Sequence, residues 1–425
     1  MAILTTLRRE VDFASLAVVR VGVGLALAIE VVRFFTNGWI AGLYGPGLFH
    51  FHYLYLDWVQ PMPVPVMHGL FGLMGLSALS LAAGWHARLC SGFLALGWGY
   101  VFLIDQTNYL NHLYMVVLVL VLLAAIPVSR GRVPGWGVWL LRFQVGVVYF
   151  FGGLAKLNAD WMSGEPMTQW MALRSEMPLV GAWLTAPEVG LGLSWAGLGF
   201  DLLIVPLLLW RRTRLFGFVL VVAFHSVNAV LFHIGIFPWL MIALTTIYFA
   251  PSWPRRWARR EAVGPSEGMA PFSLVCRVAI GSWVICQLGL PLRHWAYPGD
   301  VAWTEEGHRF AWRMKVRSKK GRVFFHVLDT ATGERTKVDP CEELPLRQCR
   351  KMSTRPDMIL QYAHHLRDEA WAQGLDVAVH VDAIGRLNQR RPQRLIDAEK
   401  NLAEVEPGLA PAPWIKALMP RTQRD

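Results

Sequence analysis

Repeated apolar stretches dominate the sequence between Ala14 and Leu290. Each contains about 20 residues, and a helix of that length rises about 30 Å, the thickness of the hydrocarbon layer of a bilayer. Only 17% of the 425 residues are charged, which is low for a water-soluble protein. We therefore expect a polytopic α-helical membrane protein with about nine transmembrane helices, at residues 14–34, 64–84, 89–105, 110–128, 136–156, 188–210, 215–231, 236–250 and 271–290.

A change in composition near residue 290 predicts two domains. From Pro291 onward, charged residues are frequent and no apolar stretch is long enough to span a bilayer. We expect a transmembrane helical domain at 1–290 and an extramembrane α+β domain at 291–425. Alternating and helical apolar patterns in the second domain predict strands at 310–317, 323–328 and 377–384 and helices at 344–352 and 357–373.

The basic residues between the spans predict the orientation. Arg8 and Arg9 precede the first span, and arginines recur in every second loop, whereas the loop at 35–63 contains no Lys or Arg. The positive-inside rule then predicts a cytoplasmic N-terminus and a periplasmic or lumenal C-terminal domain. The short loops favour a bacterial inner membrane. Because the net charge of +11 is split between two sides of a membrane, we expect no nucleic-acid binding.

Polar residues inside or beside apolar spans are costly and are therefore candidates for function. Asn111 and His112 begin the fourth expected span, where helix capping is the ordinary alternative. Lys156 ends the fifth span on the outer side, where it is either an interfacial anchor or a buried lysine able to act as a base. Asp201, within the sixth span, needs a cationic partner that the sequence does not identify.

Histidine and cysteine positions give weaker signals. His50 and His52 have a spacing suited to a metal, but no third ligand accompanies them, so we expect no metal site. Cys341 and Cys349 lie eight residues apart in the outer domain, and the spacing alone leaves their pairing open.

Several of these segments resemble one known family. The sequence is similar to the vitamin K-dependent γ-carboxylases, whose membrane part defines the wider group of horizontally transferred transmembrane-domain (HTTM) proteins. The resemblance covers essentially the whole chain in order. It is carried by residues 105–114 (DQTNYLNHLY), 149–161 (YFFGGLAKLNADW), 224–237 with Met241, 252–255 (SWPR), 311–314 (AWRM), 355–363 (RPDMILQYA) and 388–397.

The resemblance implies a chemistry in which a lysine takes a proton from vitamin K hydroquinone, with O2 and CO2 as co-substrates. It implies that Lys156 is this base, that Asn111 and His112 lie beside the cofactor, and that a glutamate-containing peptide or protein is carboxylated while vitamin K becomes its epoxide. The cofactor-binding residues that it implies are Phe237, Met241, Met314, Trp312 and Tyr149.

The expected partners are therefore this peptide, membrane lipid and a quinone reductase. Two other functions remain open. The chain ends where the animal enzymes continue into a further domain, and Lys315 stands where they have a second methionine. A quinone epoxidase that carboxylates no protein is one alternative. A non-enzymatic membrane protein that binds lipid or quinone is the other, because a fold does not fix a function.

Overall fold

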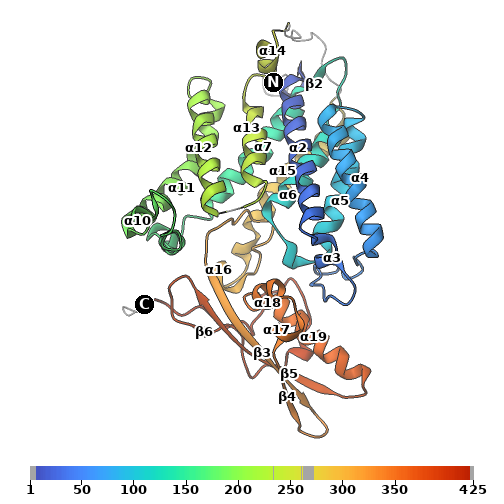
Figure 1. The fold of residues 1–425 in the computed structure, drawn as a ribbon, viewed down its shortest axis with the longest axis vertical. Coiled ribbons are helices and arrows are strands. Elements are labelled where there is room, and N and C mark those ends of the chain that lie inside the picture. Colours follow the sequence, from blue (N-terminus) through green and yellow to red (C-terminus); the bar gives the residue numbers. More distant parts are fainter. Residues whose placement is uncertain (1–5, 233, 260, 262–271, 422–425) are drawn as a thin grey trace.

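The computed structural model of the protein describes residues 6–232, 234–259, 261 and 272–421. Figure 1 shows a bundle of long helices and, at one end of it, a small α+β domain that leads to the C-terminus. Residue 271, with which the last expected span begins, lies outside the described residues. The architecture confirms a polytopic helical membrane protein with an extramembrane α+β domain.

Seven helices in the described part of the chain are long and apolar enough to cross a membrane. Each coincides with an expected span, and their ends differ from the predicted ones by three residues or fewer. They are α2 (Ala14–Thr36), α4 (Val64–Ala83), α5 (Ala87–Ile104), α7 (Gly135–Leu154), α11 (Pro187–Leu209), α12 (Arg214–Phe232) and α15 (Leu274–Leu292).

The other two expected spans are shorter apolar helices, α6 (Asn111–Ala125) and α13 (Phe237–Thr245), the latter continued by the 3₁₀ turn η2 (Thr246–Tyr248). The 15 residues of α6 rise only about 22 Å. A 3₁₀ turn, η1 (Gln106–Asn108), precedes α6, and the Asp105 carboxylate caps it by accepting a hydrogen bond of 2.7 Å from the Thr107 N–H. The expected fourth span therefore overran α6 by three residues at its C-terminal end, and the expected eighth span overran α13 by five, three of which form η2.

Short elements connect these helices. Those beside or between the long helices are α3 (Trp39–Tyr44), α8 (Ala159–Met162), α9 (Met167–Ala172), α10 (Gly181–Leu184) and α14 (Trp253–Trp257), with the two-stranded sheet of β1 (Glu10–Asp12) and β2 (Arg132–Pro134) at the other end of the bundle. The 3₁₀ turn η3 (Arg293–Ala296) and α16 (Val301–Thr304) lead from α15 into the outer domain.

The outer domain is built on an antiparallel sheet with the strand order β4-β3-β5-β6. Its elements are β3 (Lys319–Asp329), β4 (Arg335–Val338), α17 (Pro340–Glu343), α18 (Leu346–Met352), α19 (Pro356–Ala372), β5 (Val377–Leu387), β6 (Gln393–Arg394) and η4 (Leu402–Glu404). A disulfide joins Cys341 in α17 to Cys349 in α18, so the pairing that the sequence left open is present.

The strand expected at 310–317 is wrong. Phe310, Trp312 and Lys315 have φ angles of 61°, 55° and 48°, in the left-handed region that strands do not use. Strand β3 begins at Lys319, four residues before the strand expected at 323–328, so it includes the Lys-Lys-Gly sequence of residues 319–321. Gly321 is needed there because a Cβ atom at this position would lie 2.1 Å from the Ser353 carbonyl oxygen. The aromatic residues of 310–317 pack against the helical bundle.

The outer domain docks on the bundle through α18. Lys351 donates a hydrogen bond of 2.5 Å and Arg347 one of 3.2 Å to the Thr107 carbonyl of η1. Gln348 donates to the Asp105 carboxylate over 2.8 Å. The outer domain therefore holds the turn that leads directly into Asn111 and His112.

A second contact lies at α8. The Asn388 amide and the Arg390 guanidinium, at the end of β5, donate hydrogen bonds of 2.6 and 2.8 Å to the Asp160 carboxylate. Burial alone would raise the pKa of the Asp160 carboxyl, but these donors hold it below its usual range. The outer domain thus contacts the chain just before His112 and just after Lys156.

Candidate active site

Lys156 lies two residues beyond the end of α7, where its backbone N–H still donates to the Gly153 carbonyl over 2.9 Å. Its Nζ donates hydrogen bonds to the Gly152 carbonyl over 3.1 Å and to Asp201 Oδ2 over 2.5 Å. Both side chains are buried, with exposed fractions of 7% for Lys156 and 6% for Asp201. The cationic partner that the sequence left unidentified for Asp201 is therefore Lys156.

Two glycines let α7 and α11 approach closely enough for this ion pair. A Cβ atom on Gly153 would lie 2.6 Å from Leu202 Cδ2 and 3.2 Å from Asp201 Cβ. A Cβ atom on Gly152 would lie 3.1 Å from the Asp201 carboxylate. Side chains at these positions would separate the helices, so the Gly-Gly pair is a condition for the contact between Lys156 and Asp201.

His112 lies in the first turn of α6, and its ring centroid is 5.9 Å from that of Phe237 at the start of α13. Among the described residues, its imidazole has no hydrogen-bond partner. The neighbouring Asn111 accepts a hydrogen bond of 2.9 Å from the Tyr109 hydroxyl on Oδ1. The Asn111 amide group and the His112 ring are thus free to bond to a ligand.

Tyr149 belongs to a polar chain within the bundle. Its hydroxyl lies 2.9 Å from His225 Nε2 and 3.2 Å from Thr245 Oγ1. The Thr245 hydroxyl donates to the carbonyl of Met241, whose side chain is fully buried. The His225 ring centroid lies 6.0 Å from that of Phe237. Tyr149 and Met241 are therefore connected to Phe237, which contacts His112.

Trp312 and Met314 reach the bundle from the loop that precedes β3. The Trp312 ring stacks on Tyr114 of α6 with centroids 4.9 Å apart and is fully buried. The Phe310 N–H donates a hydrogen bond of 2.7 Å to the Tyr109 hydroxyl, which itself contacts Asn111. Met314 Cε lies 3.8 Å from the position that a Cβ atom on Gly152 would occupy. This loop, residues 305–317, therefore contacts the surroundings of both Asn111 and Lys156.

The structure collects the predicted residues into two groups. One contains Lys156, with Met314 close to Gly152. The other contains Asn111 and His112 with Phe237, and the polar chain of Tyr149. No hydrogen bond joins Lys156 to His112 in the described part of the chain, and the groups are connected through α7 and the 305–317 loop.

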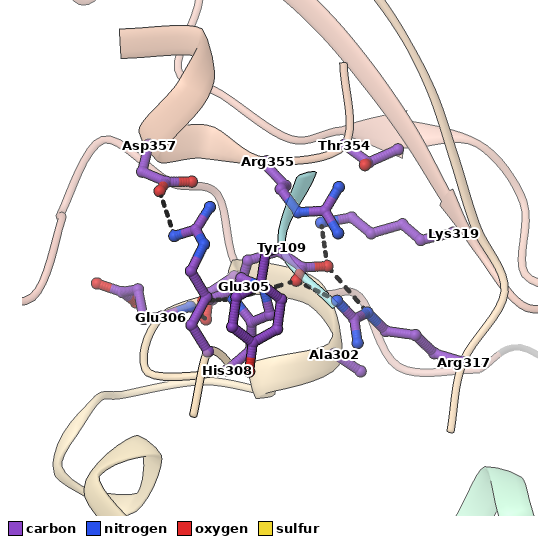
Figure 2. A network of polar contacts seen from close by, with 12 residues as sticks. Tyr109, Ala302, Glu305, Glu306, His308, Arg317, Lys319, Thr354, Arg355 and Asp357 are labelled. Carbon is purple, nitrogen blue, oxygen red and sulfur yellow. Dashed lines mark hydrogen bonds and ion pairs between the residues drawn. The ribbon is translucent and has the colours of Figure 1, made fainter. Parts of the chain in front are cut away.

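A buried charged cluster lies where the 305–317 loop enters the outer domain, and Figure 2 shows it with Glu305 at its centre. Arg317 Nε donates to Glu305 over 2.9 Å, and Lys319 Nζ lies 3.5 Å from the same carboxylate. Arg309 donates to Asp357 over 2.6 Å. Arg355 points into the same cluster, and no carboxylate among the described residues lies within ion-pair distance of it.

The cluster has more cations than carboxylates. Arg309, Arg317, Lys319 and Arg355 face Glu305 and Asp357, which leaves a surplus of two positive charges. Burial lowers the pKa of Lys319 to about 8 and that of Arg355 to about 10. These shifts reflect the cost of holding unbalanced cations away from water, a cost that an anion would reduce.

Comparison with protein families agrees with this geometry. The family model of the HTTM domain matches residues 8–253, which include the helices from α2 to α13. The model described as "Vitamin K-dependent gamma-carboxylase, lumenal domain" matches residues 273–421. The chain belongs to the vitamin K-dependent γ-carboxylase family of HTTM proteins. No solved structure gives a significant match.

Membership of the γ-carboxylase family supports a carboxylase-type membrane enzyme with a lumenal C-terminal region. The second match begins at residue 273, so α15, the last of the long helices, lies within the lumenal-domain match.

Sequence reasoning missed Tyr109 and Glu305. The HRFAWR sequence at 308–313, which alternates cations with aromatic residues beside two glutamates, is the signal that could have identified the cluster.

Proposed function

We propose that the protein is a vitamin K hydroquinone-dependent γ-glutamyl carboxylase coupled to vitamin K epoxidation, with Lys156 as the base that deprotonates the hydroquinone. The observation that carries this proposal is the buried Lys156 Nζ held by Asp201 and the Gly152 carbonyl. The bound hydroquinone would supply, on reaction with O2, a base strong enough to remove a γ-hydrogen from glutamate, which then takes up CO2.

The residues around His112 fit a quinone. Among the residues that the structure describes, the His112 ring and the Asn111 amide nitrogen have no hydrogen-bond partner, so both can bond to the oxygen atoms of the cofactor. Phe237, Met241, Met314 and Trp312 would provide apolar surface for its rings. The Tyr149 hydroxyl is already bonded to His225, so Tyr149 would act by holding that ring.

Asp201 gives Lys156 the means to hold a proton. In the ion pair Lys156 is an ammonium, so it must first release a proton before it can act as a base. The ammonium that re-forms when the amine takes the hydroquinone proton is again stabilised by the Asp201 carboxylate, 2.5 Å from Nζ. The Gly152 carbonyl accepts a second hydrogen bond from Nζ. Together the two hydrogen bonds fix the direction of the third position on Nζ, which is an N–H in the ammonium and a lone pair in the neutral amine. In this scheme, Lys156 is the catalytic residue and Asp201 is a positioning residue.

The charged cluster supports an anionic substrate that arrives from the outer side. Two of its cations, Arg309 and Arg317, lie on the loop that also contributes Met314 to the surroundings of Lys156, and the cluster as a whole has a surplus of two positive charges. A glutamyl peptide has the matching charge. We further propose a cytoplasmic N-terminus, a periplasmic outer domain in a bacterial inner membrane, and a quinone reductase as the source of the hydroquinone.

Turnover by the purified full-length protein in lipid nanodiscs tests this function. The reactants are vitamin K hydroquinone, O2, ¹⁴C-labelled CO2 and a glutamate-containing peptide, and we expect both epoxide and acid-stable label in the peptide. Epoxide without label would assign a quinone epoxidase instead. Quinone binding without either product would assign a non-enzymatic binding protein.

A further inference from the structure

A small recess lies where α4 turns into α5, beside the start of α2 and the end of α6. Figure 1 shows this end of α2 next to the N-terminus, at the end of the bundle away from the outer domain. The recess has a volume of about 30 Å³, and its lining is apolar except for Arg20, Arg88 and Ser91. Since a water-sized atom needs about 10–15 Å³, the recess can take about two such atoms.

Arg20 places a cation within the apolar helix α2. Its guanidinium donates to the Ala82 carbonyl over 3.4 Å and lies 5.6 Å from the centroid of the Phe13 ring. Both partners are uncharged, and the buried Arg20 Nε has no hydrogen-bond partner in the described part of the chain. Gly84, with a φ of 86°, makes room for the guanidinium, because a Cβ atom there would lie 2.3 Å from Arg20 Nη1. The fold thus fixes a cation in the wall of the recess without a carboxylate partner among the described residues.

The start of α5 adds hydrogen-bond donors and a second cation to the recess. Ser91 is only 1% exposed, yet its buried hydroxyl has no hydrogen-bond partner among the residues that the structure describes. No side chain caps the N-terminus of α5, which begins at Ala87, and a helix N-terminus favours an anion. The exposed Arg88 donates from Nε to the Ala124 carbonyl over 2.9 Å, an uncharged partner that leaves its positive charge in place. Two cations, an unpartnered hydroxyl and a helix N-terminus therefore meet at one point.

The surroundings of the recess favour a lipid as the source of an anion. Trp85, in the turn before α5, is 68% exposed, and Leu89, in the first turn of α5, is 73% exposed. A tryptophan exposed at the end of a spanning helix is typical of the membrane interface. Basic recesses between spanning helices bind the head groups of anionic lipids. Acyl chains would cover the apolar rim, whereas a small soluble anion would leave it exposed.

We propose that this recess binds the phosphate of an anionic phospholipid in the leaflet opposite the outer domain. One phosphate oxygen enters the recess, where Ser91 and Arg20 donate to it, and Arg88 lies against the rest of the phosphate at the rim. The acyl chains lie along the apolar helices beside Leu89. The proposal does not depend on the proposed catalytic function, because these residues lie at the end of the bundle away from Lys156.

Retention of lipid by the full-length protein tests the proposal. Detergent-solubilised protein is equilibrated with an equimolar mixture of phosphatidylglycerol and phosphatidylcholine, and bound lipid is counted by native mass spectrometry. At about 1 kcal/mol for each cation, we expect Arg88→Gln to weaken phosphatidylglycerol binding about fivefold, and Arg88→Gln with Arg20→Met about 30-fold. Ser91→Ala removes one hydrogen bond and no charge, and should weaken binding about two- to tenfold. Arg212→Gln, at an exposed arginine in the turn between α11 and α12, is the matched control and should retain the lipid.

Melting curves identify any variant that does not fold, and Arg88→Gln with Ser91→Ala decides the question if Arg20→Met is one of them. Three results would overturn the proposal. The first is retention of phosphatidylglycerol by Arg88→Gln and Ser91→Ala that equals retention by the Arg212→Gln control. The second is equal retention of phosphatidylcholine and phosphatidylglycerol by the wild-type protein. The third is displacement of the lipid by millimolar inorganic phosphate, which would indicate a site for free phosphate. Because no arm measures turnover, failure here is distinguishable from failure of the proposed function.

Discussion

The ion pair between Lys156 and Asp201 makes the sharpest prediction about stability. Substituting Asp201→Asn keeps the side-chain shape and removes the charge, which leaves a buried ammonium without its counter-ion. At a separation of 2.5 Å and an effective dielectric constant of about 20, the two charges attract each other by about 7 kcal/mol. In the variant, Lys156 can release its proton and so avoid part of the cost of a buried, unpaired charge. We therefore expect Asp201→Asn to destabilise the protein by about 3–5 kcal/mol.

A double-mutant cycle isolates the pairwise term. Asp201→Asn, Lys156→Met and the double variant are unfolded thermally and chemically in detergent micelles, with tryptophan fluorescence as the readout. We expect the double variant to recover most of the stability that either single variant loses, because no unpaired charge then stays buried. The exposed pair Lys416 and Asp397, 2.8 Å apart, is the matched control. A coupling for Lys156 and Asp201 no larger than for that pair would refute the reasoning.

Further predictions concern the outer domain and the helix contact. Burial alone would raise the pKa of Glu305, but the neighbouring cations hold it below its usual range. Glu305 therefore stabilises the fold above about pH 4.5, and this stabilisation is lost as the pH falls further. Melting curves between pH 7 and 3.5 should show this acid-dependent loss, and Glu305→Gln should lack it. Cys341→Ser should destabilise the outer domain by about 2.5 kcal/mol, the loop entropy of a disulfide across eight residues, as measured by urea unfolding; unchanged unfolding would contradict the role of this bond. Gly153→Val should cost about 1–3 kcal/mol and lower epoxide formation, because its Cβ position is 2.6 Å from a Leu202 methyl group, whereas Gly92→Val, whose Cβ position has no neighbour within 4 Å, should leave both unchanged.

Hydropathy and length predicted the long helices well. A bilayer fixes the length of an apolar helix, so the ends of α7 and α11 could be predicted to within two residues. The same rule overextended α6 and α13 at their C-terminal ends. Helix α6 ends at Ala125 because Pro127 disfavours a helical backbone at Ile126, and α13 passes into the 3₁₀ turn η2. Both endings depend on local backbone geometry rather than on hydropathy.

Contacts between distant segments could not be predicted in the same way. The sequence marked Lys156 and Asp201 as separate problems, yet their pairing depends on how closely Gly152 and Gly153 let two helices approach. The path of the 305–317 loop depends on left-handed residues such as Trp312, whose conformation no local pattern predicts. Residue types identified the candidates, and helix packing determined their partners.

The central claim is that Lys156 acts as the base, and epoxide formation tests it most directly. Purified Lys156→Ala, shown to fold by its melting curve, is compared with wild type and with the surface control Lys320→Ala, using vitamin K hydroquinone and O2. Loss of a positioned general base should lower the rate about 10²–10⁴-fold, while the control keeps the wild-type rate. Epoxide formation by Lys156→Ala at the wild-type rate would contradict the claim.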